Sequence, residues 1–221
     1  MMQMKYLIVN ADDFGYSFSV NKGIIEAHEK GIVTSTSVMV DAIASQEAAA
    51  LKHFPKLSVG LHFVVKDFSN VQAELDRQIE KFVSILDTKP DHVDTHKMHP
   101  TENDAVKLVL TKYSKANHLP VRCLGFAKFI DSFYCPDDES GFRDENNVSL
   151  ASLKASINEA TDSYNEIMCH VGYSDDYLRK TSSYNDLREK ELAVIINPMI
   201  KQYVVEQGLT LCNWKQIKFT G

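Results

Sequence analysis

The chain of 221 residues lacks the features that mark secreted, membrane-spanning or nucleic-acid-binding proteins. Its four cysteines, at positions 123, 135, 169 and 212, form no Cys-x-x-Cys pair, so we expect reduced thiols rather than disulfides or a zinc site. No apolar run approaches the roughly 20 residues of a transmembrane helix. The net charge of −6 comes without a basic stripe, which argues against nucleic acid as a partner.

The chain also lacks internal repeats, linkers and low-complexity segments. The first strand is expected at Tyr6, which leaves no room for a signal peptide. We therefore expect one cytoplasmic domain over residues 1–221, because this length suffices to bury a large core. The sequence leaves the oligomeric state open, with a homodimer as the candidate assembly.

Hydrophobic periodicity alternates between two and about 3.6 residues, which predicts strands that alternate with helices. Strands are expected at Tyr6–Ala11, Thr34–Val40, Ser58–Val65, His92–His96, Val121–Gly125, Glu166–His170 and Leu209–Asn213. Helices are expected at Val20–Lys30, Ala42–Phe54, Val71–Leu86, Asp104–Ala116, Leu150–Tyr164, Asp186–Ile196 and Pro198–Glu206. We expect Ser19 to cap the first helix and interpret residues 126–148 as a long functional loop. The pattern predicts an α/β fold, a (β/α) barrel of about seven strands, with a doubly wound open sheet as the alternative.

The adjacent acids Asp12 and Asp13 form the most informative motif. They follow the apolar run Tyr6–Ala11 and precede Phe14 and Gly15. Two adjacent carboxylates repel each other unless a cation lies between them, which favours a metal ligand beside an acid/base group over a plain turn. Asp-Phe-Gly also occurs in protein kinases, but this chain has no Gly-rich phosphate loop and no His-Arg-Asp loop.

Histidines follow the same rule at the ends of other predicted strands. His62, His96 and His170 each end a strand-like run, although His62 alone could equally be a buried core residue. His92, Asp94 and His96 alternate, so they share one face of an extended strand, where a metal is the usual partner of histidines. We expect His92 to be structural and Asp94 to orient a liganding imidazole. Barrel enzymes build their sites at these carboxyl ends of strands.

The motifs together resemble those of the YdjC-like carbohydrate deacetylases, a family that includes chitooligosaccharide deacetylases. The matching segments are Asn10–Gly15, Gly60–His62, Asp94–His96, Pro120–Arg122, Met168–Tyr173 and Ser182–Leu192. They occur in order and span nearly the whole chain. The resemblance implies a barrel related to polysaccharide deacetylases, one divalent metal ion (Mg²⁺ or Zn²⁺), and hydrolysis of the N-acetyl group of an amino sugar or short oligosaccharide.

The resemblance also implies roles for individual residues. It assigns Asp13, His62 and His96 to the metal and Asp12 to general base catalysis, and it puts His170 near the scissile amide. We expect His170 to protonate the leaving amine, since an ordinary imidazole titrates near neutrality.

The remaining candidate residues are expected to contact Asp12 or the substrate. Arg122 is expected to orient Asp12 through its forked donors. His99 is a ligand, a substrate contact or neither, and the aromatic residues of the long loop are either loop core or a platform for a sugar. The expected substrate contacts are His99, Phe133, Tyr134 and Tyr184.

Three segments differ from the family pattern, and all three lie on the substrate side. His62 is followed by Phe63–Val65 instead of a polar stretch and a long lid insertion, His99 follows only after Lys97 and Met98, and Val171 stands where proline is common. The sequence therefore predicts the type of reaction, metal-dependent deacetylation, but does not identify the sugar. Two alternative functions remain. One is another metal hydrolase on the same barrel, such as a phosphoesterase, although the shortage of basic residues around the motifs disfavours a phosphate substrate. The other is a non-catalytic sugar-binding relative.

Overall fold

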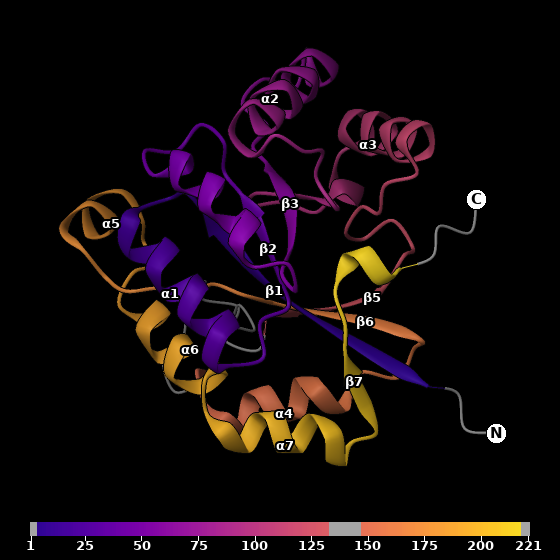
Figure 1. Cartoon of the computed structure of the whole chain (residues 1–221). Helices are drawn as coiled ribbons and strands as arrows, with labels where there is room; N and C mark the ends of the chain where they lie inside the picture. Colours follow the sequence, from indigo (N-terminus) through magenta and orange to yellow (C-terminus); the bar gives the residue numbers. More distant parts are fainter. Residues whose placement is uncertain (1–3, 133–146, 218–221) are drawn as a thin grey trace.

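A parallel β-sheet forms the centre of the molecule. The computed structural model describes residues 4–132 and 147–217, so the predicted contacts Phe133 and Tyr134 lie outside the described residues (Figure 1). The strands are β1 (Lys5–Phe14), β2 (Ser35–Val38), β3 (Ser58–Phe63), β4 (Val93–Thr95), β5 (Lys128–Ser132), β6 (Tyr164–Cys169) and β7 (Leu209–Leu211). Their order is β4-β3-β2-β1-β6-β5, and β7 pairs with β1.

β1 is the central strand of this sheet. Its start, Lys5–Leu7, pairs with β7, and its end, Asn10–Phe14, pairs with β2, while β6 follows Tyr6–Ala11. All these ladders are parallel. An isolated bridge between Val93 and Val121 extends the sheet past β4, and no ladder joins β4 to β5 within the described ranges. The sheet is thus a curled half-barrel, which confirms the predicted parallel α/β barrel class.

Helices cover the sheet and connect the strands. They are α1 (Phe18–Lys30), α2 (Val71–Leu86), α3 (Asp104–Asn117), α4 (Leu150–Asn158), α5 (Asp176–Thr181), α6 (Leu187–Ile195) and α7 (Pro198–Glu206), with 3₁₀ turns η1 (Ser45–His53), η2 (Pro100–Glu102) and η4 (Trp214–Gln216). In Figure 1, α1 lies beside α6, and α2 lies beside α3 at the opposite end of the sheet. No helix within residues 4–132 and 147–217 is long and apolar enough to cross a bilayer.

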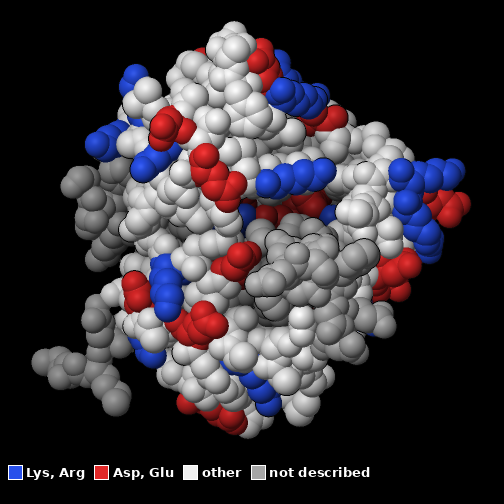
Figure 2. Space-filling view, turned by 180° about the vertical axis from the view of Figure 1, so that it is seen from behind, with Lys and Arg blue, Asp and Glu red and all other residues white. Residues whose placement is uncertain are grey.

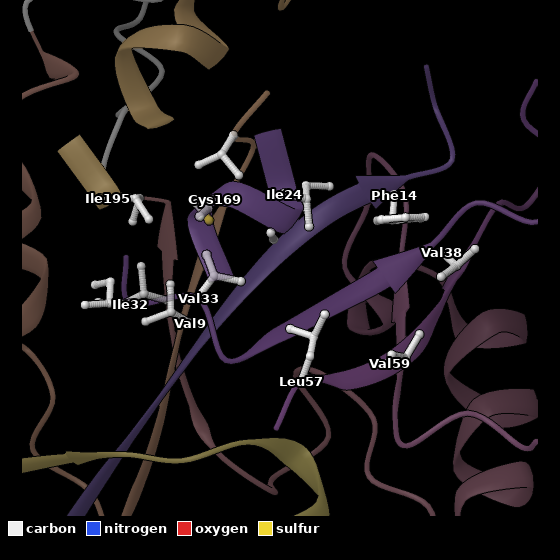
Figure 3. Close-up of a cluster of buried hydrophobic side chains, with 14 of the residues drawn as sticks. Val9, Phe14, Ile24, Ile32, Val33, Val38, Leu57, Val59, Cys169 and Ile195 are labelled. Atoms are coloured by element: carbon white, nitrogen blue, oxygen red, sulfur yellow. The ribbon is translucent and has the colours of Figure 1, made fainter. Parts of the chain in front are cut away.

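The core lies between the sheet and the helices that cover it. Val20, Ile24 and Ala27 recur at helical spacing on α1 and are fully buried in one cluster with strand residues such as Val9. Figure 3 labels Ile24 and Val9 in this cluster. Burying one such side chain as large as Ile24 stabilises the fold by about 1.5–3 kcal/mol. Cys169 is part of this core, and the three described cysteines are free, as expected.

Backbone conformation explains the main differences from the predicted elements. Cys123 and Gly125 have φ angles of 62° and 88°, so the predicted strand Val121–Gly125 turns after its single bridge. The strand β5 lies instead inside the predicted loop, where Phe129 and Ile130 favour a strand within an otherwise loop-like composition.

The helix ends also differ in detail. Ser17 rather than Ser19 caps α1, because its Oγ accepts a hydrogen bond from the backbone N–H of Val20 at 3.2 Å. The predicted helix Ala42–Phe54 forms the 3₁₀ turn η1, α4 is shorter than predicted, and α5 was not predicted.

Candidate metal centre and active site

A backbone irregularity at the end of β1 turns two adjacent carboxylates toward one site. In a regular strand Asp12 and Asp13 would point to opposite faces. The β1–β2 register shifts between Ala11 and Phe14, and Asp13 has a φ of 72° in the left-handed region. A bulge of this kind redirects a side chain, and a non-glycine residue in this conformation costs of order 1 kcal/mol. As a result Asp13 Oδ1 lies 3.2 Å from His62 Nε2, and Asp12 Oδ2 lies 3.9 Å from His62 Nδ1.

Three predicted metal ligands meet at this point. Asp13 Oδ1, His62 Nε2 and His96 Nδ1 form a triangle with edges of 3.2, 3.3 and 3.1 Å. Ligand atoms around an ion lie roughly 3.4 Å apart in a tetrahedral site and roughly 3.0 Å apart in an octahedral one. Asp13 Oδ1 is buried and satisfies no hydrogen-bond geometry with any described residue. These three residues could therefore hold a metal ion.

The other ring nitrogen of His62 contacts Asp94. Nδ1 lies 2.7 Å from Asp94 Oδ1, and both side chains are fully buried. A proton on Nδ1 donated to Asp94 leaves the Nε2 lone pair directed at the triangle. Burial disfavours a charged imidazole, but the carboxylates of Asp94, Asp13 and Asp12 outweigh it and raise the pKa of His62 to about 10. Without an ion, a proton on this ring balances part of the negative charge.

The deeper histidine of the same strand has a structural place, as predicted. His92 is fully buried, and its ring stacks on Trp214 with centroids 5.0 Å apart. A Cβ atom at position 60 would come within 2.3 Å of the His92 ring, so only glycine fits there. Gly60 thereby lets the His92 ring pack directly against β3, the strand that carries His62.

Arg122 holds the other carboxylate of the pair. Its Nη1 and Nη2 donate to Asp12 at 2.7 and 2.8 Å, and Nη2 also lies 3.0 Å from Asp94 Oδ2 and 2.8 Å from Glu166 Oε1. Burial disfavours the charge, but the surrounding acids Asp12, Asp94 and Glu166 hold the pKa of Arg122 well above its ordinary value. Asp12 is thus fixed in orientation, as the sequence predicted for Arg122.

A second arginine, from α6, contacts Asp13. Arg188 Nη2 donates to Asp13 Oδ2 at 2.7 Å, and both side chains are buried. Burial alone would raise the pKa of Asp13, but Arg188, together with His62 and His96, holds it well below its ordinary value. Asp13 is therefore an anion with one oxygen on Arg188 and one facing the imidazoles.

His170 lies at the end of β6, beside the two aspartates. Its backbone N–H donates to Glu191 Oε2 at 2.7 Å, the Tyr184 hydroxyl hydrogen-bonds the other Glu191 oxygen, and the His170 and Tyr184 rings contact edge to face at 5.8 Å. Burial lowers the pKa of His170 to about 4, although Asp13 and Asp12 act in the opposite direction. The prediction that His170 has a near-neutral pKa is therefore wrong for the metal-free protein, in which the His170 imidazole is uncharged at pH 7.

The two aspartates, the three histidines His62, His96 and His170, and both arginines line a cavity of about 320 Å³, a size suited to a small molecule. In Figure 2, acidic atoms lie inside a hollow that has a basic side chain along its upper edge. Two of the residues predicted to contact substrate, His99 and Tyr184, line the cavity, and their contact with a substrate stays a prediction. Phe129, an aromatic residue of the predicted loop, does not line the cavity. Its ring lies 5.2 Å from the Arg122 guanidinium and 5.3 Å from the His99 ring, so it packs behind these two residues.

Sequence reasoning missed four charged or polar members of the site. Asn10, whose Nδ2 donates to Asp12 Oδ1 at 2.7 Å, stands inside a recognised motif but carried no assigned role, and the same holds for Arg188 and Glu191. Glu166 had only been placed in a predicted strand. A usable signal existed for two of them: Glu166 directly precedes the apolar run Ile167–Cys169 in β6, and Glu191 shares the buried face of α6 with Arg188 and Ile195. Charged residues at such positions are almost never fully buried unless they are paired.

Comparisons with known proteins agree over nearly the whole chain. The family model described as YdjC-like protein matches residues 6–70 and 65–206. A carbohydrate deacetylase of Clostridium beijerinckii is 32% identical over 257 positions, covering 96% of this chain and 99% of that protein. A chitooligosaccharide deacetylase of Serratia marcescens is 29% identical, covering 96% and 99%. The 257 aligned positions exceed the 221 residues here, so the Clostridium relative contains segments that this chain lacks.

Solved structures share the fold at lower identity. A protein from Enterococcus faecalis aligns with a TM-score of 0.77 and 23% identity, covering 96% of this chain and 98% of that one. A family 4 carbohydrate esterase of Streptomyces lividans in complex with acetate aligns with a TM-score of 0.58 and 16% identity, covering 95% and 91%. The two structures support the fold, and the family match together with the full-length sequence identity shows that the chain belongs to the YdjC-like protein family.

Proposed function

We propose that this protein is a metal-dependent carbohydrate deacetylase that hydrolyses the N-acetyl group of an amino sugar or short oligosaccharide and releases acetate. The observation that carries the proposal is the triangle of Asp13, His62 and His96 with Asp12 beside it. The names of the relatives, carbohydrate and chitooligosaccharide deacetylase, support the class of reaction.

The balance of buried charge supports a resident cation. Among the described residues, the carboxylates of Asp12, Asp13, Asp94 and Glu166 are buried around Arg122 and Arg188, the two guanidinium groups that face them. The carboxylate of Glu191 is also buried, beside His170 and Tyr184. Buried charges are stable only when they are paired, and a divalent cation would supply the missing positive charge. Asp13, His62 and His96 would hold it, as Mg²⁺ or Zn²⁺. When bound, the ion supplies Lewis-acid polarisation of the acetyl carbonyl.

Asp12 is the proposed general base. A water molecule adds to the acetyl carbon, and the carboxylate of Asp12 accepts a proton from that water. The two hydrogen bonds from Arg122 keep the carboxylate in one orientation, so no reorganisation is needed when the water attacks. A water-derived OH group thus remains on carbon and becomes part of acetate.

His170 is the proposed donor to the leaving nitrogen. The C–N bond breaks, the nitrogen takes a proton, and the free amine departs. Because burial lowers the pKa of His170 to about 4, its imidazole is neutral at pH 7 and carries a single N–H. In the proposed step the ring passes one proton to the leaving nitrogen and regains one from Asp12, which has taken it from the water. The ring contact with Tyr184 and the Glu191 hydrogen bond to the backbone keep the imidazole in place for this transfer.

The substrate side of the site favours an open pocket. The connection from β3 to α2 is short, residues 64–70, and the match to the family model divides within this connection. Mostly polar side chains line the cavity, including Lys97, His99 and Glu102. This lining suits the hydroxyl groups of a sugar, and the open side leaves room for a short oligosaccharide.

An acetate-release assay tests the proposal. Chelator-treated protein is supplied with Mg²⁺ or Zn²⁺ and a panel of N-acetylated monosaccharides and chitooligosaccharides, and acetate and new reducing ends are both measured. We expect acetate without cleavage of glycosidic bonds. Sugar binding without acetate across the whole panel would favour the non-catalytic alternative, and release of phosphate from phosphate esters would favour the phosphoesterase alternative.

A further inference from the structure

We propose that Arg188 is a positioning residue for the metal centre: it holds one oxygen of Asp13 so that the other oxygen alone faces the ion. The inference rests on the proposed metal centre and adds a residue from α6 to it.

The two oxygens of Asp13 have different partners. Oδ1 lies 3.2 Å from His62 Nε2 and 3.3 Å from His96 Nδ1, whereas Oδ2 accepts a hydrogen bond from Arg188 Nη2 at 2.7 Å. A carboxylate free to rotate could chelate an ion through both oxygens. With Oδ2 held by a buried guanidinium, Asp13 is prepared to bind through a single oxygen.

Arg188 is itself held from several sides. Its Nε donates to the carbonyl of Tyr184 at 3.0 Å, and its guanidinium lies 5.7 and 5.8 Å from the rings of Tyr184 and Tyr16. Its backbone carbonyl accepts a hydrogen bond from Gly172 N–H at 3.3 Å, which ties α6 to the segment after β6. The planar group is therefore fixed before any ion arrives.

Arg188 holds the carboxylate of Asp13 in one orientation, as Arg122 holds that of Asp12. Two adjacent carboxylates at the end of β1 each have an arginine of their own, one from the segment between α3 and β5 and one from α6. This division keeps Asp12 available as the base and Asp13 as the ligand. Without Arg188, Asp13 would have freedom to rotate within the site, and the ligand geometry would loosen.

A purely structural role for the Arg188–Asp13 ion pair makes a different prediction. An ion pair that only ties α6 to the sheet would affect the unfolding temperature of the metal-free protein and leave the coordination of the ion unchanged. Metal affinity and ligand geometry therefore separate the two roles, and Co²⁺ is a suitable probe because its visible spectrum reports its coordination.

The test compares Arg188→Gln and Arg188→Lys with the wild-type protein, using Co²⁺ alone. For Arg188→Gln we expect a Co²⁺ dissociation constant about 10- to 100-fold higher, the usual effect of losing a group that orients a ligand, and an altered visible spectrum. Arg188→Lys should recover part of the affinity because it keeps the charge but not the fork. Arg179→Gln on α5, which changes a half-exposed arginine, is the matched control and should bind as wild type.

A second measurement needs no variant. In a crystal structure of the wild-type protein loaded with Co²⁺, Asp13 should bind the ion through Oδ1 while Oδ2 stays on Arg188. Bidentate Asp13, or a folded Arg188→Gln protein with wild-type affinity and spectrum, would overturn the role of Arg188 and leave the metal centre standing. No Co²⁺ binding by the wild-type protein would overturn the metal centre itself.

Discussion

The Nδ1 atom of His62 lies 2.7 Å from Asp94 Oδ1, so the imidazole proton has a fixed acceptor and the opposite nitrogen faces the predicted ligand triangle. This contact joins β3 to β4, whose residues His62 and Asp94 are direct neighbours in the parallel ladder. Strand register therefore sets the direction of the liganding nitrogen.

Asp94→Ala should weaken metal binding while the triangle residues remain. Without the acceptor, the His62 ring can rotate or change tautomer, and we expect about a 10- to 100-fold loss of affinity by calorimetry. Asp176→Ala, on the exposed start of α5, is the control. Wild-type affinity in folded Asp94→Ala protein would mean that the His62 ring is oriented by other contacts.

Metal binding should release protons, and the metal-free protein should lose stability at high pH. The pKa of His62 is about 10 in the folded metal-free protein, above the value of about 6.5 for an unfolded chain. Protonated His62 therefore stabilises the metal-free protein fully below pH about 6.5, and this contribution disappears as the pH rises through 10.

An ion has to displace that proton. Calorimetry at pH 7 in buffers of different ionisation enthalpy should show release of about one proton per ion bound, and the release should fade above pH 10. The unfolding temperature of metal-free protein should fall over the same range, and that of metal-loaded protein should fall less. Binding at pH 7 without proton release would contradict the charged state of His62.

Asp12→Asn should retain the metal and lose most activity. The amide keeps the shape and one acceptor for Arg122 but cannot take a proton from water. General acid–base groups contribute on the order of a hundred- to ten-thousand-fold in rate, and we expect a loss of kcat in this range. Retained activity above a tenth of wild type, at equal metal content, would assign the base elsewhere.

His170→Ala should also retain the metal, because His170 is outside the triangle. The loss of rate should be large for an acetamido sugar and smaller for an acetyl substrate whose leaving group needs no proton. Equal losses on both substrates, or loss of the metal, would remove His170 from the role of donor. His99, which lines the same cavity, would then be the next candidate.

The sequence was most informative about site residues that directly follow an apolar strand. Asp12, Asp13 and His62 are visible as polar residues at the ends of apolar runs, and parallel strands bring such ends to one edge. Asp94 and Arg122 could also be anticipated, because each lies on or beside a predicted strand that leads to the same edge.

Other parts of the site depend on geometry that the sequence does not display. The left-handed conformation of Asp13, which turns both acids to one side, is a local bulge without a distinctive residue pattern. Arg188 is 175 positions from Asp13, and a helix face does not reveal which strand it covers. The backbone turn at Cys123 likewise occurs at a residue type that rarely adopts positive φ, so the predicted strand there was wrong.

The most direct test of the account follows bound metal and acetate release in one titration. Chelator-treated wild-type protein is loaded stepwise with Zn²⁺ or Mg²⁺, and bound ions and the rate of acetate release from an N-acetylated chitooligosaccharide are measured at each step, with His62→Ala in parallel. The account predicts that the rate rises with occupancy, stops rising at one ion per chain, and stays near zero in His62→Ala, which should bind no stoichiometric ion. Acetate release that does not depend on occupancy, or a His62→Ala protein with wild-type metal affinity, would contradict it.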